Sequence, residues 1–362
     1  MRIIAVGDIM PGGVLSITNN VFATKDIMDF LAQGDLRVGN FECAVEVANP
    51  SSKKVSGRGN TIFIREKDVL RIKQLNIDIV SIANNHLFDL GPEGAFHAID
   101  ALDRLGIKHC GAGRNLEEAK KPVVVEKDGQ TFAFLAFSDT RLDYMYEATN
   151  KEPGVNPLRE QYVVDEIKKA RLKYDHVIVI PHWGRENTYF PTLEVESLAK
   201  KMINAGACLV LGGHSHRIQP VVKKCHGIIV FSMGNFLFSN RIINQPRFTW
   251  YPKEPIDINA LPQTIGCPLV NTPTIKLWRP LAYIGMMVDS NIGRRKMQIR
   301  YKLTYTDMNN CVDIMKEGNL HQRFILFLLG TSVKLGIYKY VHYICNYYKR
   351  RKRQKKTRKG IK

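Results

Sequence analysis

The sequence has few of the features that mark secreted, disulfide-stapled or membrane-spanning proteins. Seven cysteines are scattered over 362 residues without a C-x-x-C pair. This pattern argues against a disulfide framework or a zinc knuckle and fits a reducing compartment. No run of about 18 uncharged apolar residues occurs, so a standard membrane-spanning helix is not expected. Internal repeats are also lacking.

An export signal is missing from the amino terminus. The apolar stretch around Arg2 is short, and Gly7-Asp8 follows it at once. A signal peptide needs a longer apolar region and a cleavage site with small residues. We therefore expect residues 3–6 to form the first strand of the fold, and we expect the protein to be cytoplasmic.

Acidic residues are scarce relative to basic ones, with 34 Asp and Glu against 53 Lys and Arg and a formal net charge of +19. Ten of the basic residues lie in 349–362, a stretch without any acid, so about half of the net charge belongs to this tail. Apolar residues make up 44% and charged residues 24%, which excludes wholesale disorder. The length fits one large domain or two.

Short apolar runs rich in β-branched residues recur and end in polar or glycine-rich residues. They predict buried strands at 3–6, 36–38, 77–83, 132–137, 177–180, 209–211 and 228–231. Helix-like stretches lie between several of them, at 67–75, 94–105, 163–174 and 193–205. This alternation predicts an α/β protein. A late hairpin, 284–288 with 297–305, is expected to complete a sheet.

Residues 241–282 differ in composition, because seven prolines and two tryptophans fall there. Proline at this density argues against regular strand or helix interiors. The segment is therefore expected to be a long insertion. Two interpretations stay open: a surface excursion without a role, or a lid or partner loop.

Polar residues cluster directly after the apolar runs. The clusters contain Asp8, Asn40, Glu42, Asn84, Asn85, His86, Asp89, His182, Trp183, Glu186, His214, His216 and Asn235. In an open α/β sheet, ligands bind outside the carboxyl ends of the strands, so these clusters can converge. Carboxylates and amides together with imidazoles suit Mn, Fe or Zn better than Mg or Ca.

The ordered motifs Gly7-Asp8, Asn40-Phe41-Glu42, Asn84-Asn85-His86, His182-Trp183-Gly184, Gly213-His214-Ser215-His216 and Gly234-Asn235-Phe236 resemble the CapA family. That family comprises capsule-synthesis proteins named for poly-gamma-glutamate, related to the calcineurin-like metallophosphoesterases. The resemblance covers roughly residues 1–240. It implies a metallophosphatase-like layered α/β sandwich with a centre for one or two divalent metal ions at the sheet edge.

The resemblance also implies roles for individual residues. Metal ligands would be Asp8, Glu42 (bridging), Asn85, His182, His214 and His216. His86 would act on the substrate as an acid or as a stabiliser of developing charge, and Asp89 would orient it. Residues that support the site or touch substrate would be Asn40, Asn84, Trp183, Glu186 and Asn235.

Plainer interpretations exist for several of these residues. Asp8 and Asn85 could satisfy turn backbone, and Asp89 could cap the following helix. Trp183 is more typical of a packing or substrate-wall residue than of a catalytic one. One departure also matters: Met10 stands where phosphoesterases usually have a histidine, and a thioether is a poor ligand for hard divalent ions. The first metal site would then be short of one ligand.

Two functions from different classes follow. The first is a metal-dependent hydrolase acting on a phosphoester or amide bond in the biosynthesis of a capsule or cell-surface polymer of the poly-gamma-glutamate type. The second is a non-catalytic assembly subunit of a membrane polymer-synthesis complex with a partial metal site. The expected partners are an anionic polymer or its precursor and other capsule-synthesis subunits.

The sequence predicts that the chain has three regions. They are a main domain over 1–305, a helical segment over 306–348 and a disordered polybasic tail over 349–362. An aromatic-rich helix beside basic residues is typical of an anchor lying on an anionic membrane surface, here the inner face of the cell membrane. The alternative is a core-packed terminal helix with a solvated tail. Nucleic acid is an unlikely partner, because no basic or aromatic pattern in the main domain supports it.

Overall fold

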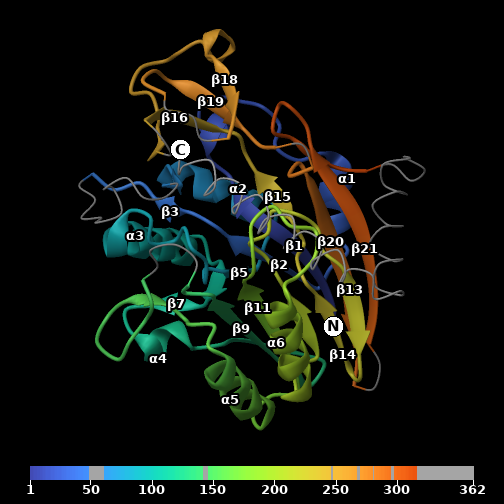
Figure 1. The fold of residues 1–362 in the computed structure, drawn as a ribbon. Coiled ribbons are helices and arrows are strands. Elements are labelled where there is room, and N and C mark those ends of the chain that lie inside the picture. Colours follow the sequence, from blue (N-terminus) through green and yellow to red (C-terminus); the bar gives the residue numbers. More distant parts are fainter. Residues whose placement is uncertain are drawn as a thin grey trace, which may run out of the picture.

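The structure, a computed structural model, describes residues 1–48, 61–141, 146–245, 248–266, 270–279, 281–294 and 297–315. Two β-sheets pack face to face, and helices cover the outer face of each (Figure 1). The described part of the chain is therefore a layered α/β sandwich, as the sequence predicts.

The first sheet brings the two ends of the described chain together. In spatial order it contains β22 (Val312–Ile314), β21 (Met297–Thr306), β20 (Ile284–Ile292), β1 (Arg2–Met10), β2 (Leu36–Phe41), β5 (Ile79–Ser81) and β6 (Lys108–Cys110). β15 (Asn235–Phe238) pairs with the end of β1. Strands β1, β2, β5 and β6 run parallel, while β20 to β22 are antiparallel. The predicted late hairpin is thus β20 with β21.

The second sheet has a parallel centre and antiparallel edges. Its order is β13 (Val221–Lys224), β14 (Gly227–Val230), β12 (Leu209–Leu211), β11 (His176–His182), β9 (Gln130–Ser138) and β8 (Val123–Lys127). The four strands from β14 to β9 are parallel, and the outer two are not. All seven apolar runs of the sequence lie in or overlap strands of the two sheets.

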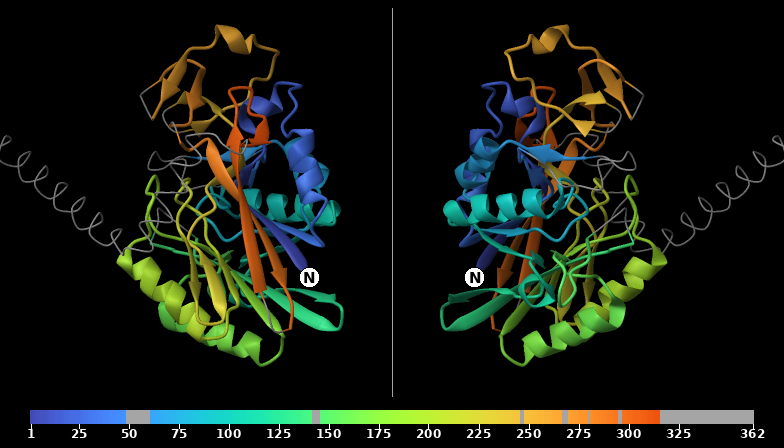
Figure 2. Two further views of the ribbon diagram at one scale, coloured as in Figure 1. Left: turned by 90° about the vertical axis from the view of Figure 1, so that its right-hand side faces the viewer. Right: turned by 90° about the vertical axis from the view of Figure 1, so that its left-hand side faces the viewer.

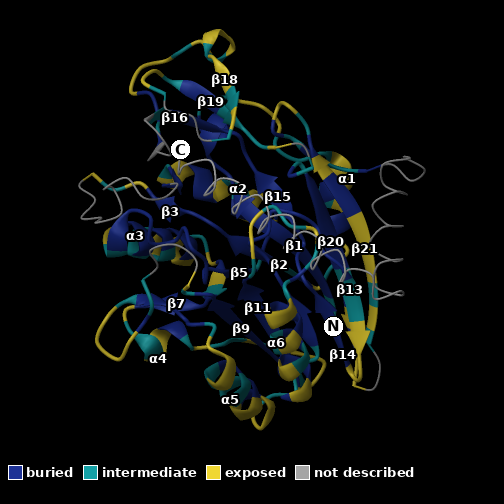
Figure 3. Cartoon of the chain, viewed as in Figure 1, coloured by how far each residue is buried: buried dark blue, intermediate teal, exposed yellow. Residues whose placement is uncertain are grey.

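Burial on both faces explains why these strands read as continuous apolar runs. In β1, Ile3 and Ala5 face the opposite sheet, whereas Ile4 and Val6 face the helices. Successive side chains of a strand point to opposite faces, so a sheet covered on both sides needs apolar residues at every position. The buried strands form the dark centre of Figure 3, and exposed residues lie on the outer faces of helices, along β21, and in the loops and the insertion.

Helices lie on the two sides of the sandwich, and all of them except α1 overlap the helix-like stretches of the sequence. The first sheet is covered by α1 (Lys25–Leu31), α2 (Leu70–Gln74) and α3 (Gly91–Arg104), and the second by α5 (Glu160–Arg171) and α6 (Leu193–Asn204). Figure 2 shows the two groups on opposite sides. α6 begins after Thr192, whose side chain accepts a hydrogen bond from the Val195 amide, a standard way to satisfy a helix start.

Short elements link these layers. They are η1 (Gly13–Ser16), β3 (Ala44–Val45), β4 (Phe63–Ile64), η3 (Glu66–Val69), β7 (Ala112–Gly113), α4 (Leu116–Ala119) and β10 (Gly154–Val155).

The insertion (residues 241–282) forms a small sheet of its own, so the prediction that its prolines exclude regular strands is wrong. The strands are β17 (Phe248–Thr249), β16 (Arg241–Gln245), β19 (Thr274–Leu277) and β18 (Gln263–Ile265), with η4 (Ile258–Ala260) between two of them. Pro262 and Pro273 stand directly before β18 and β19, where a missing N–H removes no interior ladder bond. The insertion sits at one end of the sandwich (Figures 1 and 2).

The expected helical segment 306–348 is wrong at its beginning. β21 ends at Thr306, and residues 312–314 form the edge strand β22 instead of a helix. Pairing of β22 with β21 explains this, because it extends the existing sheet. The rest of that segment and the basic tail lie outside the described residues. Among the helices that are described, none has the length and apolar character required to cross a bilayer.

Candidate metal centre

Polar side chains from both sheets meet at the edge of the sandwich where the parallel strands end. Asp8 lies near the end of β1, and His182 is the last residue of β11. Glu42 directly follows β2, while Asn85 and His214 follow β5 and β12. All five side chains are buried. The fold thus brings together residues that are up to two hundred positions apart in the sequence.

One group of ligand atoms comes from Glu42, His182 and His214, and these atoms lie within 4.8 Å of one another. His182 Nε2 is 3.1 Å from His214 Nδ1 and 3.5 Å from Glu42 Oε1. Asn85 adds its amide oxygen, 2.9 Å from His182 Nε2. Atoms that coordinate one ion tetrahedrally at about 2.1 Å lie roughly 3.4 Å apart, so these four atoms fit a single ion.

A second group of ligand atoms comes from Asp8, Glu42 and His216, again within 4.8 Å of one another. His216 Nδ1 is 3.5 Å from Asp8 Oδ2, and His216 Nε2 is 3.7 Å from Glu42 Oε1. Glu42 belongs to both groups. The arrangement therefore suits two ions that share the Glu42 carboxylate.

Two buried carboxylate oxygens in this centre lack a hydrogen-bond partner among the described residues, Asp8 Oδ2 and Glu42 Oε1. Burial, and after it the charge of Asp8, raises the pKa of Glu42 well above its usual value. Such groups are costly to bury without a compensating partner. A divalent cation between these oxygens would supply that partner and offset the repulsion, so the residues present fit a metal.

The imidazoles of the first group are held in the form that binds metals. Burial lowers the pKa of His182 well below its usual value, and the neighbouring His214 and His216 lower it further. Burial also lowers the pKa of His214 to about 4, against the opposing charge of Glu186. Both rings therefore keep their lone pairs at neutral pH, the state required of a ligand.

The backbone that carries the two histidines after β12 is unusual. His214 and His216 have φ angles of 84° and 50°, the left-handed region that non-glycine residues rarely adopt. Gly213 packs between the two sheets: a Cβ added there would lie 2.8 Å from Asp8 Oδ1 and 3.5 Å from His182 Nδ1. The chain therefore turns tightly after β12, and one imidazole of this turn belongs to each group of ligand atoms.

Asn40 ties the carboxylates of the centre together. Its Nδ2 donates to Asp8 Oδ1 at 2.8 Å and to Glu42 Oε2 at 3.2 Å. Asn84 lies behind it, donating from Nδ2 to the carbonyl of Phe41 at 2.7 Å. Both asparagines thus lie behind the two carboxylates, and Asp8 Oδ2 and Glu42 Oε1 are left without a hydrogen bond from them.

Asn235 supports the other side. Its Oδ1 is 2.9 Å from His216 Nδ1, and its Nδ2 donates to the carbonyl of Ala282 at 3.1 Å. The residue therefore holds the His216 ring in place through its amide oxygen.

His86 and Asp89 form a pair next to the centre. His86 Nδ1 lies 2.6 Å from Asp89 Oδ2, which also accepts the Ile62 amide at 2.7 Å. An aspartate that accepts from backbone N–H is held as an acceptor, so we assign the proton of this contact to His86 Nδ1. The Nε2 atom of His86 lies 3.2 Å from Asn85 Nδ2, so a substrate that reaches this atom would replace the Asn85 contact.

A family model described as "Bacterial capsule synthesis protein PGA_cap" matches residues 2–240. The chain belongs to this family. All the ligand, supporting and His86–Asp89 residues described above lie inside the matched range, and the insertion begins at the residue that follows it.

Curated relatives agree with the family. "Capsule biosynthesis protein CapA" of Bacillus anthracis is 30% identical over 241 residues, covering 64% of this chain and 58% of that protein. "PGA biosynthesis protein CapA" of Bacillus subtilis (strain 168) is 29% identical over 238 residues, covering 64% of this chain and 62% of that protein. The chain thus matches about three fifths of the length of these relatives.

Solved structures resemble the PGA_cap chain only distantly. The structure of Haemophilus influenzae NAD nucleotidase gives a TM-score of 0.41 at 11% sequence identity, covering 91% of this chain and 56% of that one.

Two residues that the sequence singles out lie away from the centre of this PGA_cap domain. Trp183 is buried in the core between the second sheet and its helices, with Nε1 donating to the carbonyl of Phe231 at 2.9 Å, so it is a packing residue. Met10 is fully buried in the core beside the first sheet's helices and supplies no ligand.

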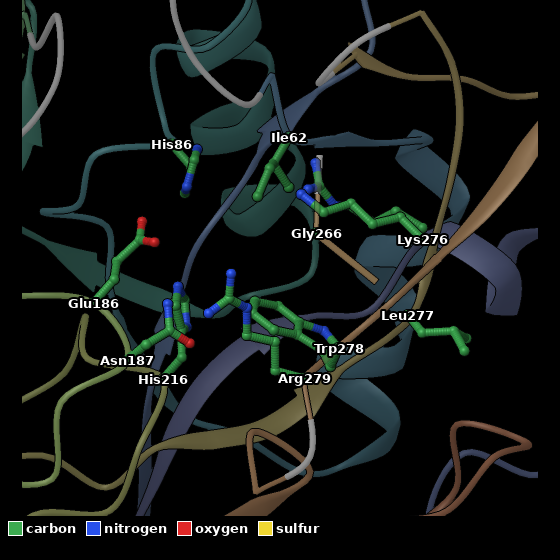
Figure 4. Close-up of a pocket in the computed structure, with 11 residues that line it drawn as sticks. Ile62, His86, Glu186, Asn187, His216, Gly266, Lys276, Leu277, Trp278 and Arg279 are labelled. Atoms are coloured by element: carbon green, nitrogen blue, oxygen red, sulfur yellow. The ribbon is translucent and has the colours of Figure 1, made fainter. Parts of the chain in front are cut away.

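A cavity of about 270 Å³ opens beside the centre, and the insertion roofs it. His86, Glu186 and His216 line one side (Figure 4). Lys276 and Trp278 of the insertion line the other. The Trp278 ring lies 4.9 Å from the His216 ring, centroid to centroid.

The sequence does not identify the residues of the insertion that line the cavity. They are Arg241, Gly266, Lys276, Leu277, Trp278 and Arg279. The one available signal was the string of basic and aromatic residues at 276–279, and nothing in the sequence places that string against His86 or His216.

Proposed function

We propose that this protein is a metal-dependent hydrolase acting in the biosynthesis of a capsule or cell-surface polymer of the poly-gamma-glutamate type. The bond cleaved is a phosphoester or an amide. Membership of the PGA_cap family and the names of the curated relatives support the process. The observation that carries the enzymatic part is the pair of ligand groups that share Glu42.

The residues around the centre have distinct parts in this proposal. Asn85, His182 and His214 would hold one ion, Asp8 and His216 the other, and Glu42 both. A divalent ion of the Mn, Fe or Zn class would act as a Lewis acid, polarising the scissile bond and making water a nucleophile near neutral pH.

His86 would handle the proton. Its Nδ1 is held by Asp89, which fixes the ring, and its Nε2 lies 3.2 Å from Asn85 Nδ2. As an imidazolium, His86 would donate the Nε2 proton to a leaving group or to a developing negative charge and become the neutral ring that keeps its proton on Nδ1. The carboxylate of Asp89 would stabilise the imidazolium during that transfer. Because His86 lines the cavity, a substrate lying there can reach it.

A second candidate is a non-catalytic assembly subunit of a membrane polymer-synthesis complex. The burial of Met10 favours it, since a ligand that phosphoesterases have is replaced here by an apolar core residue. In this case the metal centre would be structural or partial, and the protein's contribution would be its surface.

Metal analysis of the purified protein separates the two candidates. We expect at least stoichiometric Mn, Fe or Zn, lost in the double variant His214→Ala/His216→Ala, together with loss of polymer production in cells. The variant Trp183→Phe serves as a control for core packing near the site. Absence of metal, with polymer production unchanged in the double variant, would leave only the assembly role.

We also propose that residues 323–362 attach the protein to an anionic membrane surface. The sequence supports this with an aromatic-rich segment followed by ten basic residues, each of which contributes about 1 kcal/mol near such a surface. Flotation assays with two kinds of vesicle test this proposal. One kind contains phosphatidylserine and is anionic, and the other consists of phosphatidylcholine alone. Full-length protein should float with the anionic vesicles and a chain ending at residue 315 should not; equal behaviour of the two contradicts the proposal.

A further inference from the structure

The side of the cavity that the insertion forms is basic, and the opposite side is formed by residues at the candidate metal centre. Three cationic side chains of the insertion line it, Arg241, Lys276 and Arg279, and Glu186 is the acidic residue among the described lining residues. In Figure 4 the side chains of Lys276 and Glu186 approach the cavity from opposite sides. The basic residues all lie beyond residue 240, where the family match ends.

Strand register places two of these cations side by side. Arg241 of β16 pairs with Lys276 of β19 in antiparallel register. The next pair, Ile242 with Ile275, faces the opposite side and packs with Val14 in a small apolar cluster. The alternation of the two strands therefore turns one face of the insertion's sheet toward its own core and the other, with both cations, toward the cavity.

The guanidinium of Arg241 and the ammonium of Lys276 belong to residues that both line the cavity. Arg241 is also buried, at 4% exposure, where its Nη1 donates to the Thr249 hydroxyl at 3.3 Å. An oxyanion bound in the cavity would accept charge-assisted hydrogen bonds from both side chains. A guanidinium beside an ammonium is a pairing that suits carboxylate or phosphate oxygens.

The insertion holds this face firmly in place. Tyr251 accepts a hydrogen bond from the Gly13 amide at 2.9 Å and donates to the Phe63 carbonyl at 3.0 Å. The Thr249 hydroxyl donates to the Thr61 carbonyl at 2.8 Å. These buried bonds join the insertion to the main sandwich, so the cations have a fixed position relative to His86 and His216.

We propose that Arg241 and Lys276 bind an oxyanion group of the substrate, a carboxylate or a phosphate, next to the scissile bond at the metal centre. The insertion would then select substrates with a negative group beside the bond that is cleaved. The part of this inference that concerns the reaction rests on the proposed function. The anion site itself is formed by residues of the insertion.

Binding of two small anions to metal-stripped protein tests the site without the metal. The protein is treated with chelator, dialysed free of it and titrated with inorganic phosphate and, separately, with glutarate, followed by calorimetry or by chemical shifts. We expect Lys276→Gln to weaken binding of the better anion about tenfold, the loss of one charge-assisted hydrogen bond. Lys276→Arg should keep most of the affinity.

Lys253→Gln is the matched control, because it removes the same charge from an exposed position of the insertion outside this cavity. Its affinity should equal that of the unaltered protein. The anion that binds more tightly shows whether the site takes a phosphate or a carboxylate. Arg241→Lys provides a second variant of the site.

Two results would overturn the anion site: no binding of either anion, or equal weakening in Lys276→Gln and Lys253→Gln. Titration with Mn²⁺ is read separately. If the unaltered protein does not bind Mn²⁺, the proposed function is contradicted and the anion result is unaffected. Failure of the proposed function and failure of the anion site can therefore be told apart.

Discussion

At the scale of single residues, the metal centre depends on close approach as much as on the ligands. Gly213 lies where the two sheets meet, with Asp8 on one side and His182 on the other. Any side chain there would occupy the space between ligands of both ion positions. Glycine at this position therefore lets the Asp8 carboxylate keep its place beside His182.

Gly213→Ala should reduce metal affinity by at least tenfold, because its methyl group would press on Asp8 at 2.8 Å and a well-packed interior resists such insertion. Mn²⁺ titration by calorimetry measures this. Gly129→Ala is the control, since a Cβ there meets no atom within 4 Å; it should lose some stability and keep its metal affinity. Unchanged Mn²⁺ binding in the first variant would contradict the assignment of Asp8.

Glu42→Gln should raise the stability of the metal-free protein by about 1–3 kcal/mol at pH 7, since it removes a buried charge beside Asp8. The pKa of Glu42 is raised in the fold, so its ionisation costs stability above the pKa of the unfolded chain, and this cost shrinks as pH falls. The gain from Glu42→Gln should therefore narrow from pH 7 toward pH 5. Urea unfolding at both pH values measures the gain in free energy of unfolding. A gain that is larger at pH 5 than at pH 7 would contradict the prediction.

At the scale of elements, the insertion shows how a proline-rich segment becomes a fixed roof. Its strands are short, two of them begin directly after a proline, and buried side-chain hydrogen bonds fasten it to η1 and β4. The Trp278 ring then contacts the His216 ring. A segment outside the family match thus touches a predicted ligand of the family's centre.

Tyr251→Phe should cost about 2 kcal/mol of unfolding free energy, because the change leaves the Gly13 amide and the Phe63 carbonyl buried without the partner they have now. Urea denaturation measures the loss. Tyr301→Phe, at a tyrosine that is 43% exposed on β21, should stay within about 0.5 kcal/mol. Equal effects in the two variants would show that the Tyr251 hydroxyl does not anchor the insertion.

At the scale of the whole molecule, the candidate metal ligands come from both sheets, so a bound ion would join the two halves of the sandwich. Asp8 and Glu42 belong to the first sheet's edge, and His182 and His214 to the second's. Anything that binds the folded state alone stabilises it by mass action. The metal should therefore act on global unfolding as well as on activity.

Mn²⁺ at about 100 times its dissociation constant should add about 2.7 kcal/mol to the free energy of unfolding. Thermal unfolding with Mn²⁺, and with Mg²⁺ as the comparison ion, measures the effect. His182→Ala should abolish the gain from Mn²⁺, because His182 faces both Asn85 and His214. An equal gain in that variant would place the ion elsewhere.

The sequence by itself determined the α/β class and the order of the buried strands, and its resemblance to the CapA family implied the layered sandwich and the candidate residues of the centre. Strands buried on both faces require continuous apolar runs, and the polar residues that end those runs must lie at the carboxyl edge of the sheets. That logic brought Asp8, Glu42, His182 and His214 to one place in advance of any structure.

Only the tertiary structure decided which ligands group together, that Trp183 packs in the core, and what covers the cavity. Distances such as that between Glu42 Oε1 and His182 Nε2 depend on how the two sheets face each other, which no local pattern encodes. The insertion is the clearest case. Its prolines suggested irregular chain, yet register between β16 and β19 sets Arg241 beside Lys276, because pairing across a long loop is a property of the folded chain alone.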